Sequence, residues 1–215
     1  MVVLGIETAG DSGGAALISA GGEYEVFVTL GRAGGELLPK AVDAVLRVAE
    51  VRRDQIELLA VDIGPGSFTG LRIGVAFANG MAQALDIPVV GVRQTEAVAR
   101  PVGWWPGKVA VWIHDRREFV YAAWATQERV GAETVLPWSD ALAKVRDQPG
   151  TLLVGSGAVR FRNEVRTAAP EVVCAAEVLA RPRPAEVARL GLNRFQSEGV
   201  ATVRRLEPHY VHKED

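Results

Sequence analysis

Apolar and polar residues alternate in short blocks at the start of the chain, in a pattern typical of strands joined by tight turns. Residues 2–8 and 15–19 are mostly apolar, and residues 24–30 alternate in part between apolar and polar positions. Glycine-rich turns separate these blocks. Because antiparallel neighbours can be joined by turns this short, we predict a three-stranded antiparallel meander.

Helical spacing follows the meander. Residues 36–51 carry apolar positions at intervals of three and four, which predicts an amphipathic helix with an unusually wide apolar stripe. We then predict a strand over residues 58–63, a helix over 71–85 that is rich in glycine and alanine, and a short buried strand over 89–92. The order of these elements indicates an α/β architecture.

The pattern begins again after a segment rich in proline and glycine near residues 100–107. In the second half we predict strands over residues 109–114, 118–126 and 152–154 and helices over 139–147 and 184–197. We predict an extended tail over residues 206–212. We therefore predict a two-lobed α/β fold in which each lobe starts with an antiparallel meander. The first lobe spans residues 1–100 and the second 101–215, with the C-terminal helix as a candidate to pack back on the first lobe.

Composition narrows the range of functions. The chain has 24 Lys and Arg residues against 26 Asp and Glu residues, a net charge of −2, which argues against a protein that coats nucleic acid. One cysteine, Cys174, allows neither an intrachain disulfide nor a thiolate zinc site, and we interpret it as a small buried hydrophobe. With no signal peptide and no apolar run long enough to cross a bilayer, we expect a soluble, cytoplasmic protein that does not bind membranes. The five tryptophans lack interleaved basic residues, so we expect them to pack in cores and linkers.

A glycine-rich turn between a predicted strand and a predicted helix is the most informative segment. Free backbone N–H groups and the helix dipole favour anions at such a turn. The turn has neither the lysine of a Walker loop nor the serine spacing of a nucleophile elbow. Phosphate binding and a purely structural turn therefore both stay open. The candidate residues for a nucleotide or a partner are Gly64, Gly66, Ser67, Thr69, Gly70 and Arg72.

Other chemistry has weaker support. The three histidines, His114, His209 and His212, do not have a convincing metal-ligand spacing, and no Ser/His/Asp set is evident. Glu7 and Asp62 lie near the ends of neighbouring predicted strands, where they could hold Mg²⁺ or be ordinary acidic residues. We predict no catalytic residue and no metal ligand in this chain.

The segment Gly-Pro-Gly-Ser-Phe-Thr-Gly-Leu-Arg-Ile-Gly, followed at residues 86–92 by Asp-Ile-Pro-Val-Val-Gly-Val, resembles the TsaB (YeaZ) family. Supporting likenesses run along the chain, at residues 4–8, 37–39, 115–121, 155–158 and 207–211. The sequence departs from the family where Glu7 replaces the usual Asp, Ala9 the usual Ser, and Gly34-Gly35 a His-Ser pair.

The resemblance implies an actin-like ATPase fold (ASKHA, ribonuclease H-like) and a non-catalytic role. It implies a heterodimer with a TsaD homologue, the threonylcarbamoyltransferase that forms threonylcarbamoyladenosine next to the tRNA anticodon. The ATPase TsaE would join the complex, and tRNA would be bound only through the complex. The chain would have no cofactor of its own, while ATP or ADP with Mg²⁺ could lie at the complex interface.

The apolar stripe and the small-residue helix are the candidate partner surface, or else both face the chain's own sheet. We expect Leu38→Glu or Val45→Glu to break association with TsaD without unfolding the chain, and the same surface could form a homodimer when no partner is present. The surface comprises Leu37, Leu38, Val42, Val45, Leu46, Ile73 and Phe77. Two other functions stay open, a free-standing ATP-binding enzyme of the same fold and a peptidase.

Overall fold

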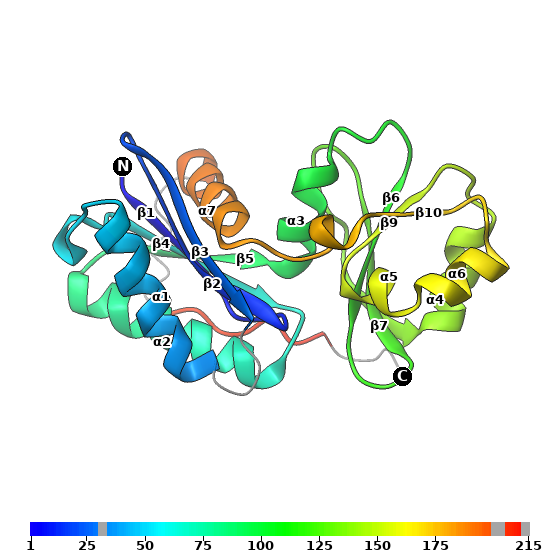
Figure 1. Ribbon diagram of the computed structural model, residues 1–215, viewed down its shortest axis with the longest axis horizontal. Coiled ribbons are helices and arrows are strands. Elements are labelled where there is room, and N and C mark those ends of the chain that lie inside the picture. The colour runs from blue at the N-terminus through cyan, green and yellow to red at the C-terminus, as the bar shows by residue number, and fades with distance from the viewer. Residues whose placement is uncertain (30–33, 199–204, 212–215) are drawn as a thin grey trace. The chain divides into compact units, whose positions relative to one another are not determined.

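The chain forms two units, each built on a five-stranded sheet (Figure 1). The computed structural model describes residues 1–29, 34–198 and 205–211. Unit 1 comprises Met1–Ala97 and Pro182–His209, and unit 2 comprises Val98–Arg181 and Tyr210–Asp215. The division at residue 97 lies near the predicted boundary, but residues 182–209 belong to unit 1 rather than to the second half of the chain.

The sheet of unit 1 has the strand order β3-β2-β1-β4-β5. The three strands of the meander are antiparallel, as predicted, while β4 and β5 run parallel to β1. The strands are β1 (Val3–Glu7), β2 (Ser12–Ser19), β3 (Gly22–Thr29), β4 (Leu58–Gly64) and β5 (Val89–Arg93). Since β1 and β4 are parallel neighbours, their carboxyl ends lie at the same edge of the sheet.

Helices cover both faces of this sheet (Figure 1). One face carries α1 and α2, whose apolar residues form a single core with the strands. The other face is covered by α7, which packs Val187 and Ala188 against the strands. The helices of unit 1 are α1 (Gly34–Val48), η2 (Arg53–Gln55), α2 (Phe68–Leu85) and α7 (Pro184–Glu198), and α3 (Gln94–Ala99) continues from β5 across the division between the units.

Unit 2 repeats the topology of unit 1. Its sheet has the order β10-β9-β6-β7-β8, in which β6, β7 and β8 form the antiparallel meander and β9 pairs with β6 in parallel. Its strands are β6 (Val109–His114), β7 (Phe119–Ala125), β8 (Thr134–Pro137), β9 (Leu152–Val154) and β10 (Val173–Cys174). Its helices are η3 (Arg100–Val102), α4 (Trp138–Arg146), α5 (Ser156–Arg160), α6 (Arg162–Ala168) and η4 (Glu177–Leu179).

Most predicted elements are present with shifted ends. The sequence pattern missed α3, β8 and β10, which are short, and it started α2 three residues too late because Phe68 already belongs to the helix. The tail is described only up to residue 211, so the predicted extended segment is partly outside the described residues, as is His212. No described helix has the length and apolar character needed to cross a membrane.

Candidate functional site: a buried carboxyl pair under a glycine loop

Glu7 and Asp62 lie side by side at the carboxyl edge of the unit 1 sheet. Glu7 ends β1, Asp62 lies in the parallel neighbour β4, and the preceding residues Ile6 and Val61 pair in register. Both side chains are completely buried. The sequence placed these two acids near each other, but it did not indicate that they are buried together.

Backbone amides hold one oxygen of each carboxyl. Glu7 Oε1 accepts hydrogen bonds from the N–H groups of Ala9 (2.7 Å) and Gly10 (3.1 Å), and Asp62 Oδ1 accepts one from Gly64 (2.7 Å). The other oxygens, Glu7 Oε2 and Asp62 Oδ2, are buried and have no hydrogen-bond donor among the described residues. Two carboxylate oxygens can bond to each other only through a proton, so a shared proton would satisfy both.

The pKa values of the pair fit a shared proton. Burial, and then the charge of Asp62, raise the pKa of Glu7 well above its usual value. Burial likewise raises the pKa of Asp62 to about 6, although a hydrogen bond from Glu7 opposes this. Burial therefore favours a proton on this pair, and a proton between Glu7 Oε2 and Asp62 Oδ2 would satisfy both oxygens.

The glycine loop packs against the first turn of the chain. A Cβ atom at Gly70 would lie 2.0 Å from the carbonyl oxygen of Thr8, and one at Gly66 would lie 2.6 Å from that of Ala9. Thr8 Oγ1 donates to the Gly70 carbonyl (2.7 Å), and the Ser67 N–H donates to the Ala9 carbonyl (2.8 Å). These glycines are required for close contact within the protein, which accounts for them without a phosphate.

The loop does not fit a nucleotide phosphate as it stands. The amides of Ala9 and Gly10 already bind Glu7, and that of Gly64 binds Asp62. The Ser67 amide binds Ala9, and the Gly70 amide binds the Ser67 hydroxyl (3.2 Å), which caps α2. Five amides of the turn and the loop are thus occupied by the protein's own acceptors, which removes them as phosphate contacts.

The remaining predicted loop residues are at the surface. Thr69 is exposed, and the Arg72 guanidinium lies 3.8 Å from the centre of the Phe68 ring. Among the described residues, no group of three or more His, Cys, Asp or Glu side chains could hold a metal ion. Glu7 and Asp62 also have an unbonded amide nitrogen beside them, Gln94 Nε2, rather than a third carboxylate.

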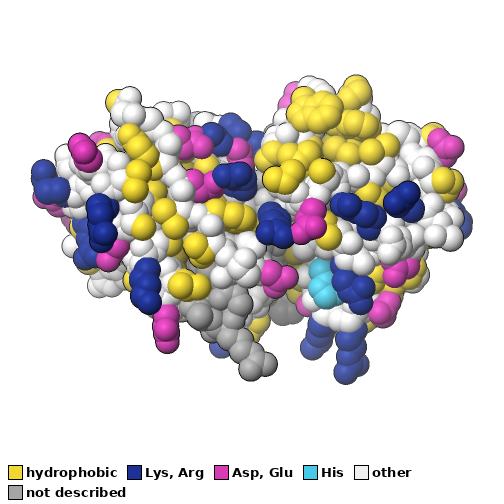
Figure 2. Space-filling model, in the orientation of Figure 1, with side chains coloured by type: hydrophobic (Ala, Val, Ile, Leu, Met, Phe, Trp, Pro, Cys, Tyr) yellow, Lys and Arg dark blue, Asp and Glu magenta, His cyan; other side chains and the backbone are white. Residues whose placement is uncertain are grey.

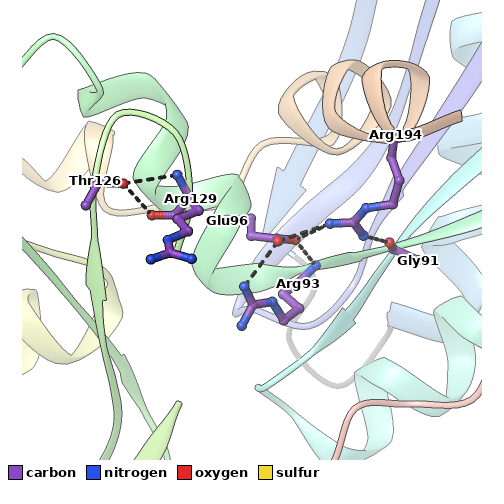
Figure 3. Close-up of polar contacts among 6 residues, drawn as sticks. All are labelled: Gly91, Arg93, Glu96, Thr126, Arg129 and Arg194. Atoms are coloured by element: carbon purple, nitrogen blue, oxygen red, sulfur yellow. Dashed lines mark hydrogen bonds and ion pairs between the residues drawn. The ribbon is translucent and has the colours of Figure 1, made fainter. Parts of the chain in front are cut away.

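A charged network joins α7 to β5 and to α3, the helix that begins at Gln94 (Figure 3). The Glu96 carboxylate accepts hydrogen bonds from Arg93 Nη2 (3.2 Å) and from Arg194 Nη2 (3.0 and 3.1 Å), and Arg194 also donates to the Gly91 carbonyl. Burial alone would raise the pKa of Glu96, but Arg194 and Arg93 hold that pKa below its usual value. The network connects α7 to β5 and α3, and thereby fixes the helix that carries Gln94.

The predicted partner surface needs a correction. Four of its residues lie in the core of unit 1, because α1 turns its apolar stripe toward the sheet; they are Leu38, Val42, Val45 and Leu46. The expectation that Leu38→Glu or Val45→Glu would leave the chain folded is therefore wrong. Leu37, Ile73 and Phe77 are half-buried, and partner binding itself stays a prediction.

The free face of α2 is a different stripe, which the sequence did not single out. Ala76, Gly80 and Ala84 are exposed at intervals of four, so they lie along one side of the helix. A Cβ atom at Gly80 would meet no described atom within 4 Å, whereas one at Gly74, on the buried side, would lie 2.2 Å from Thr8 Oγ1. The spacing of the small residues is visible in the sequence. It does not distinguish glycines that face the protein from glycines that face outward.

Predicted residues of unit 2 have mixed environments. Trp112 is buried, as expected, whereas Trp104 is 66% exposed and Trp124 is 38% exposed. Cys174 is only half-buried, and burial raises the pKa of its thiol. Among the described residues, His114 belongs to no group of His, Cys, Asp or Glu side chains that could hold a metal ion.

Comparison with known proteins now places this geometry in a family. A family model described as "TsaD: tRNA N6-adenosine threonylcarbamoyltransferase" matches residues 30–192, more than half of the chain. The chain belongs to the TsaD family. The "tRNA threonylcarbamoyladenosine biosynthesis protein TsaB" of Bacillus subtilis is 26% identical to this chain over 220 residues. The match covers 98% of this chain and 94% of the relative.

Solved structures agree with the TsaD-family assignment at the level of the fold. A protein of Pseudomonas aeruginosa with similarity to the peptidase YeaZ superposes with a TM-score of 0.81 at 23% identity, covering 98% of this chain and 99% of the other. The ROK hexokinase of Thermus thermophilus gives a TM-score of 0.51 at 14% identity, covering 92% and 100%. The resemblance to the TsaB (YeaZ) family and the actin-like ATPase fold are both confirmed.

Three of the motifs that resemble TsaB lie at turns of this TsaD-family fold. The glycine loop joins β4 to α2, and the segment 115–121 spans the turn between β6 and β7. The segment 155–158 joins β9 to α5. Each of these three motifs thus lies where a strand ends, the place at which open α/β sheets carry their sites.

Proposed function

We propose that this protein is a non-catalytic partner of a TsaD-type threonylcarbamoyltransferase in the formation of threonylcarbamoyladenosine on tRNA. One observation supports the non-catalytic part: five backbone amides of the first turn and the glycine loop are bound by the protein's own acceptors, namely those of Ala9, Gly10, Gly64, Ser67 and Gly70. Sites that bind phosphate on this kind of turn need those amides free. The TsaD-family match and the TsaB relative support the pathway.

The partner would dock on the outer face of α2. Ala76, Gly80 and Ala84 leave the helix backbone uncovered, so a second helix could approach it closely. The half-buried Ile73 and Phe77 border this stripe and add apolar area. A stable interface buries about 1,600 Å² in total, so α1 and α2 would both contribute to it. A TsaE-type ATPase would join this pair, tRNA would be bound by the assembled complex, and the same stripe could form a homodimer in the absence of TsaD.

Reconstitution tests the role. The modification reaction is run with the cognate TsaD homologue, the other factors and tRNA, with and without this chain. We expect modified nucleoside only when the chain is present. Equal modification without the chain would overturn the proposal, and so would modification or ATP turnover by this chain alone, which would instead favour a free-standing enzyme. Hydrolysis of a peptide that disappears in Ser67→Ala would favour a peptidase.

A pair of variants tests the surface. Gly80→Arg places a large charged side chain on the open stripe of α2, where the glycine has free space, so the chain should stay folded. We expect it to weaken binding to the TsaD homologue at least tenfold in calorimetry. Ala143→Arg is the matched control, because Ala143 is an exposed alanine on α4 of unit 2. If both variants bind like the original chain, the partner does not dock on this stripe.

A further inference from the structure

Arginines gather at one end of unit 2, around the turn between β6 and β7. Arg116 and Arg117 are exposed on this turn, and Arg160 is exposed at the end of α5. His114 joins the two places, because its Nε2 lies 3.1 Å from the Arg117 carbonyl oxygen and its ring centre lies 5.9 Å from that of Phe161. The Arg160 guanidinium is 5.3 Å from the same Phe161 ring. Figure 2 shows Lys and Arg side chains projecting from the surface beside a histidine on this unit. We name Arg116, Arg117 and Arg160 the arginine cluster.

The arginine cluster differs from the other arginines in its pairing. Arg183, which precedes α7, and Arg189 and Arg194 within α7 each bind a glutamate of unit 1. In the described part of the chain, Arg117 and Arg160 form no ion pair, and Arg116, whose side chain is 87% exposed, reaches only Asp115 at 3.9 Å. These guanidinium groups keep their donors available for a ligand.

The acids near the arginine cluster are already engaged. Asp115 accepts a hydrogen bond from the Tyr121 hydroxyl (3.2 Å), and Glu118 accepts one from the Trp138 indole nitrogen (2.5 Å). Both carboxylates are held toward aromatic side chains of the protein. These bonds orient the two carboxylates but leave their charges in place, so the three arginines exceed the two acids by one positive charge.

Two features distinguish the arginine cluster from an ordinary surface turn. Arg117 has a φ of 55°, a left-handed conformation in which glycine or asparagine is favoured and an arginine is strained. Arg160 also lies beside a pair of stacked rings, because Trp138 stacks on Phe161 with ring centres 5.2 Å apart and an angle of 17°. Because Phe161 is fully buried, the stack supports Arg160 from below, and the contacts open to an RNA are those between guanidinium groups and phosphates.

We infer that the arginine cluster contacts the phosphate backbone of RNA, which in the complex is the tRNA substrate. This inference rests on the proposed function, and it assigns to this chain a direct contact with tRNA. Guanidinium groups pair with phosphate oxygens in two-point contacts. Such contacts would position the RNA without reading its sequence.

The test measures binding of fluorescently labelled tRNA to the complex of this chain with its TsaD homologue, by anisotropy at several KCl concentrations. The variant carries Arg116→Gln, Arg117→Gln and Arg160→Gln together. We expect affinity to fall at least tenfold at low salt, and the slope of log K against log[salt] to decrease by about 2 to 3, since each lost phosphate contact removes about 0.7 to 0.9. Arg146→Gln is the matched control, because Arg146 is exposed in the same unit and pairs with Asp147; it should change neither quantity.

The outcomes separate this inference from the proposed function. If the triple variant assembles with the TsaD homologue and binds tRNA with unchanged affinity and slope, the inference is overturned, while the need for the chain in the reaction stands. If the triple variant fails to bind the TsaD homologue but the isolated chains are folded by circular dichroism, the arginine cluster is a protein interface instead, and the inference is again overturned. If omission of the whole chain does not affect modification, the proposed function fails first.

Discussion

At the scale of single residues, Glu7 acts as an internal anion for the first turn. Its carboxyl accepts hydrogen bonds from the amides of Ala9 and Gly10. A bound phosphate would accept the same kind of hydrogen bonds on such a turn. Glu7 stands where TsaB-like sequences usually have the shorter Asp, and its length lets it reach both amides. The side chain therefore closes the turn and at the same time faces Asp62 with its second oxygen.

The buried carboxyl pair predicts a stability that depends on pH. Both folded-state pKa values are raised above their ordinary values, 4.5 for Glu7 and 3.8 for Asp62. The stabilising contribution is thus fully present below about pH 4 and is lost as pH rises through the folded pKa values, which for Asp62 is about 6. For Asp62 alone the loss by pH 8 is on the order of 3 kcal/mol. Denaturant unfolding at pH 4, 6 and 8 measures it.

Glu7→Gln isolates the cause. The amide oxygen of the new side chain can accept the same two backbone donors, and its nitrogen can donate to Asp62 without a titrating proton. We expect this variant to be more stable than the original chain at pH 8 and similar at pH 4. Glu128→Gln, an exposed glutamate of unit 2, should leave the pH profile unchanged. An original chain that is equally stable at pH 4 and pH 8 would contradict the shared proton.

Two glycines of α2 make a second test at this scale. Gly74→Ala would place a methyl group 2.2 Å from Thr8 Oγ1 and disturb its bond to Gly70, so we expect a loss of about 1–3 kcal/mol of unfolding free energy. Gly80→Ala meets open space, and should stabilise the isolated chain by about 0.5–1 kcal/mol through helix propensity. Thermal melts of the two variants give the comparison. Equal effects on the two melting temperatures would mean that the loop does not pack on Thr8 as described.

At the scale of elements, the periodicity of the sequence was sufficient for the long helices and for the meanders. It predicted α1 and α2 because their apolar residues recur at helical spacing, and it predicted the first three strands from their glycine turns. It missed β8, which has four residues and ends in Pro137, and α3, which has six residues. Such short elements have too few residues to show a period and are fixed by tertiary contacts instead.

The candidate site shows the same limit. Strand order brings Glu7 and Asp62 to one edge, and this was visible in the sequence because each acid follows an apolar run. The occupation of the loop amides was not visible, because it depends on which carbonyl or carboxyl lies opposite each amide in three dimensions. The apolar stripe of α1 was likewise predicted with the correct residues, but it packs against the sheet of unit 1 instead of a partner. Periodicity identifies a buried face but not the layer that covers it.

Two valines of α1 test this reading. Val45 is 1% exposed and packs in the core, so Val45→Glu should cost more than about 3 kcal/mol and unfold unit 1. Val48 is 66% exposed near the end of the same helix, so Val48→Glu should change stability by less than about 0.5 kcal/mol. Circular dichroism melts of the isolated variants decide. A folded Val45→Glu variant would support the expectation from the sequence that this stripe of α1 is free to bind a partner.

At the scale of the whole molecule, the two units are copies of one topology with different connections. The strand order of unit 1 corresponds to that of unit 2 when both are written from the outer strand of the meander. Unit 2 takes its described core from one continuous stretch, Val98–Arg181, whereas unit 1 is completed by Pro182–His209. Unit 1 is therefore finished only after unit 2 has been made.

This dependence predicts the result of a truncation. In α7, the carbonyl of Pro184 and the Cβ of Ala188 lie against Gly5 of β1, and Gly191 lies against Ala60 of β4, so the helix covers the sheet at close range. A chain that ends at Arg181 would expose this face, including the completely buried Val3 and Leu58. Each fully buried aliphatic side chain is worth about 1.5–3 kcal/mol, so we expect unit 1 to unfold.

Hydrogen exchange can follow the two units of the truncated chain separately. We expect the amides of β1, β4 and β5 to lose protection, while those of β6, β7 and β9 keep it because their sheet and core lie within residues 98–181. A chain that ends at Val211 is the control, because it keeps α7 and the extended segment in which the His209 N–H donates to Ile63 (2.7 Å). Protection of β1 in the shorter chain would show that α7 is an attachment to unit 1 rather than part of its core, and the close packing at Gly5 argues against that result.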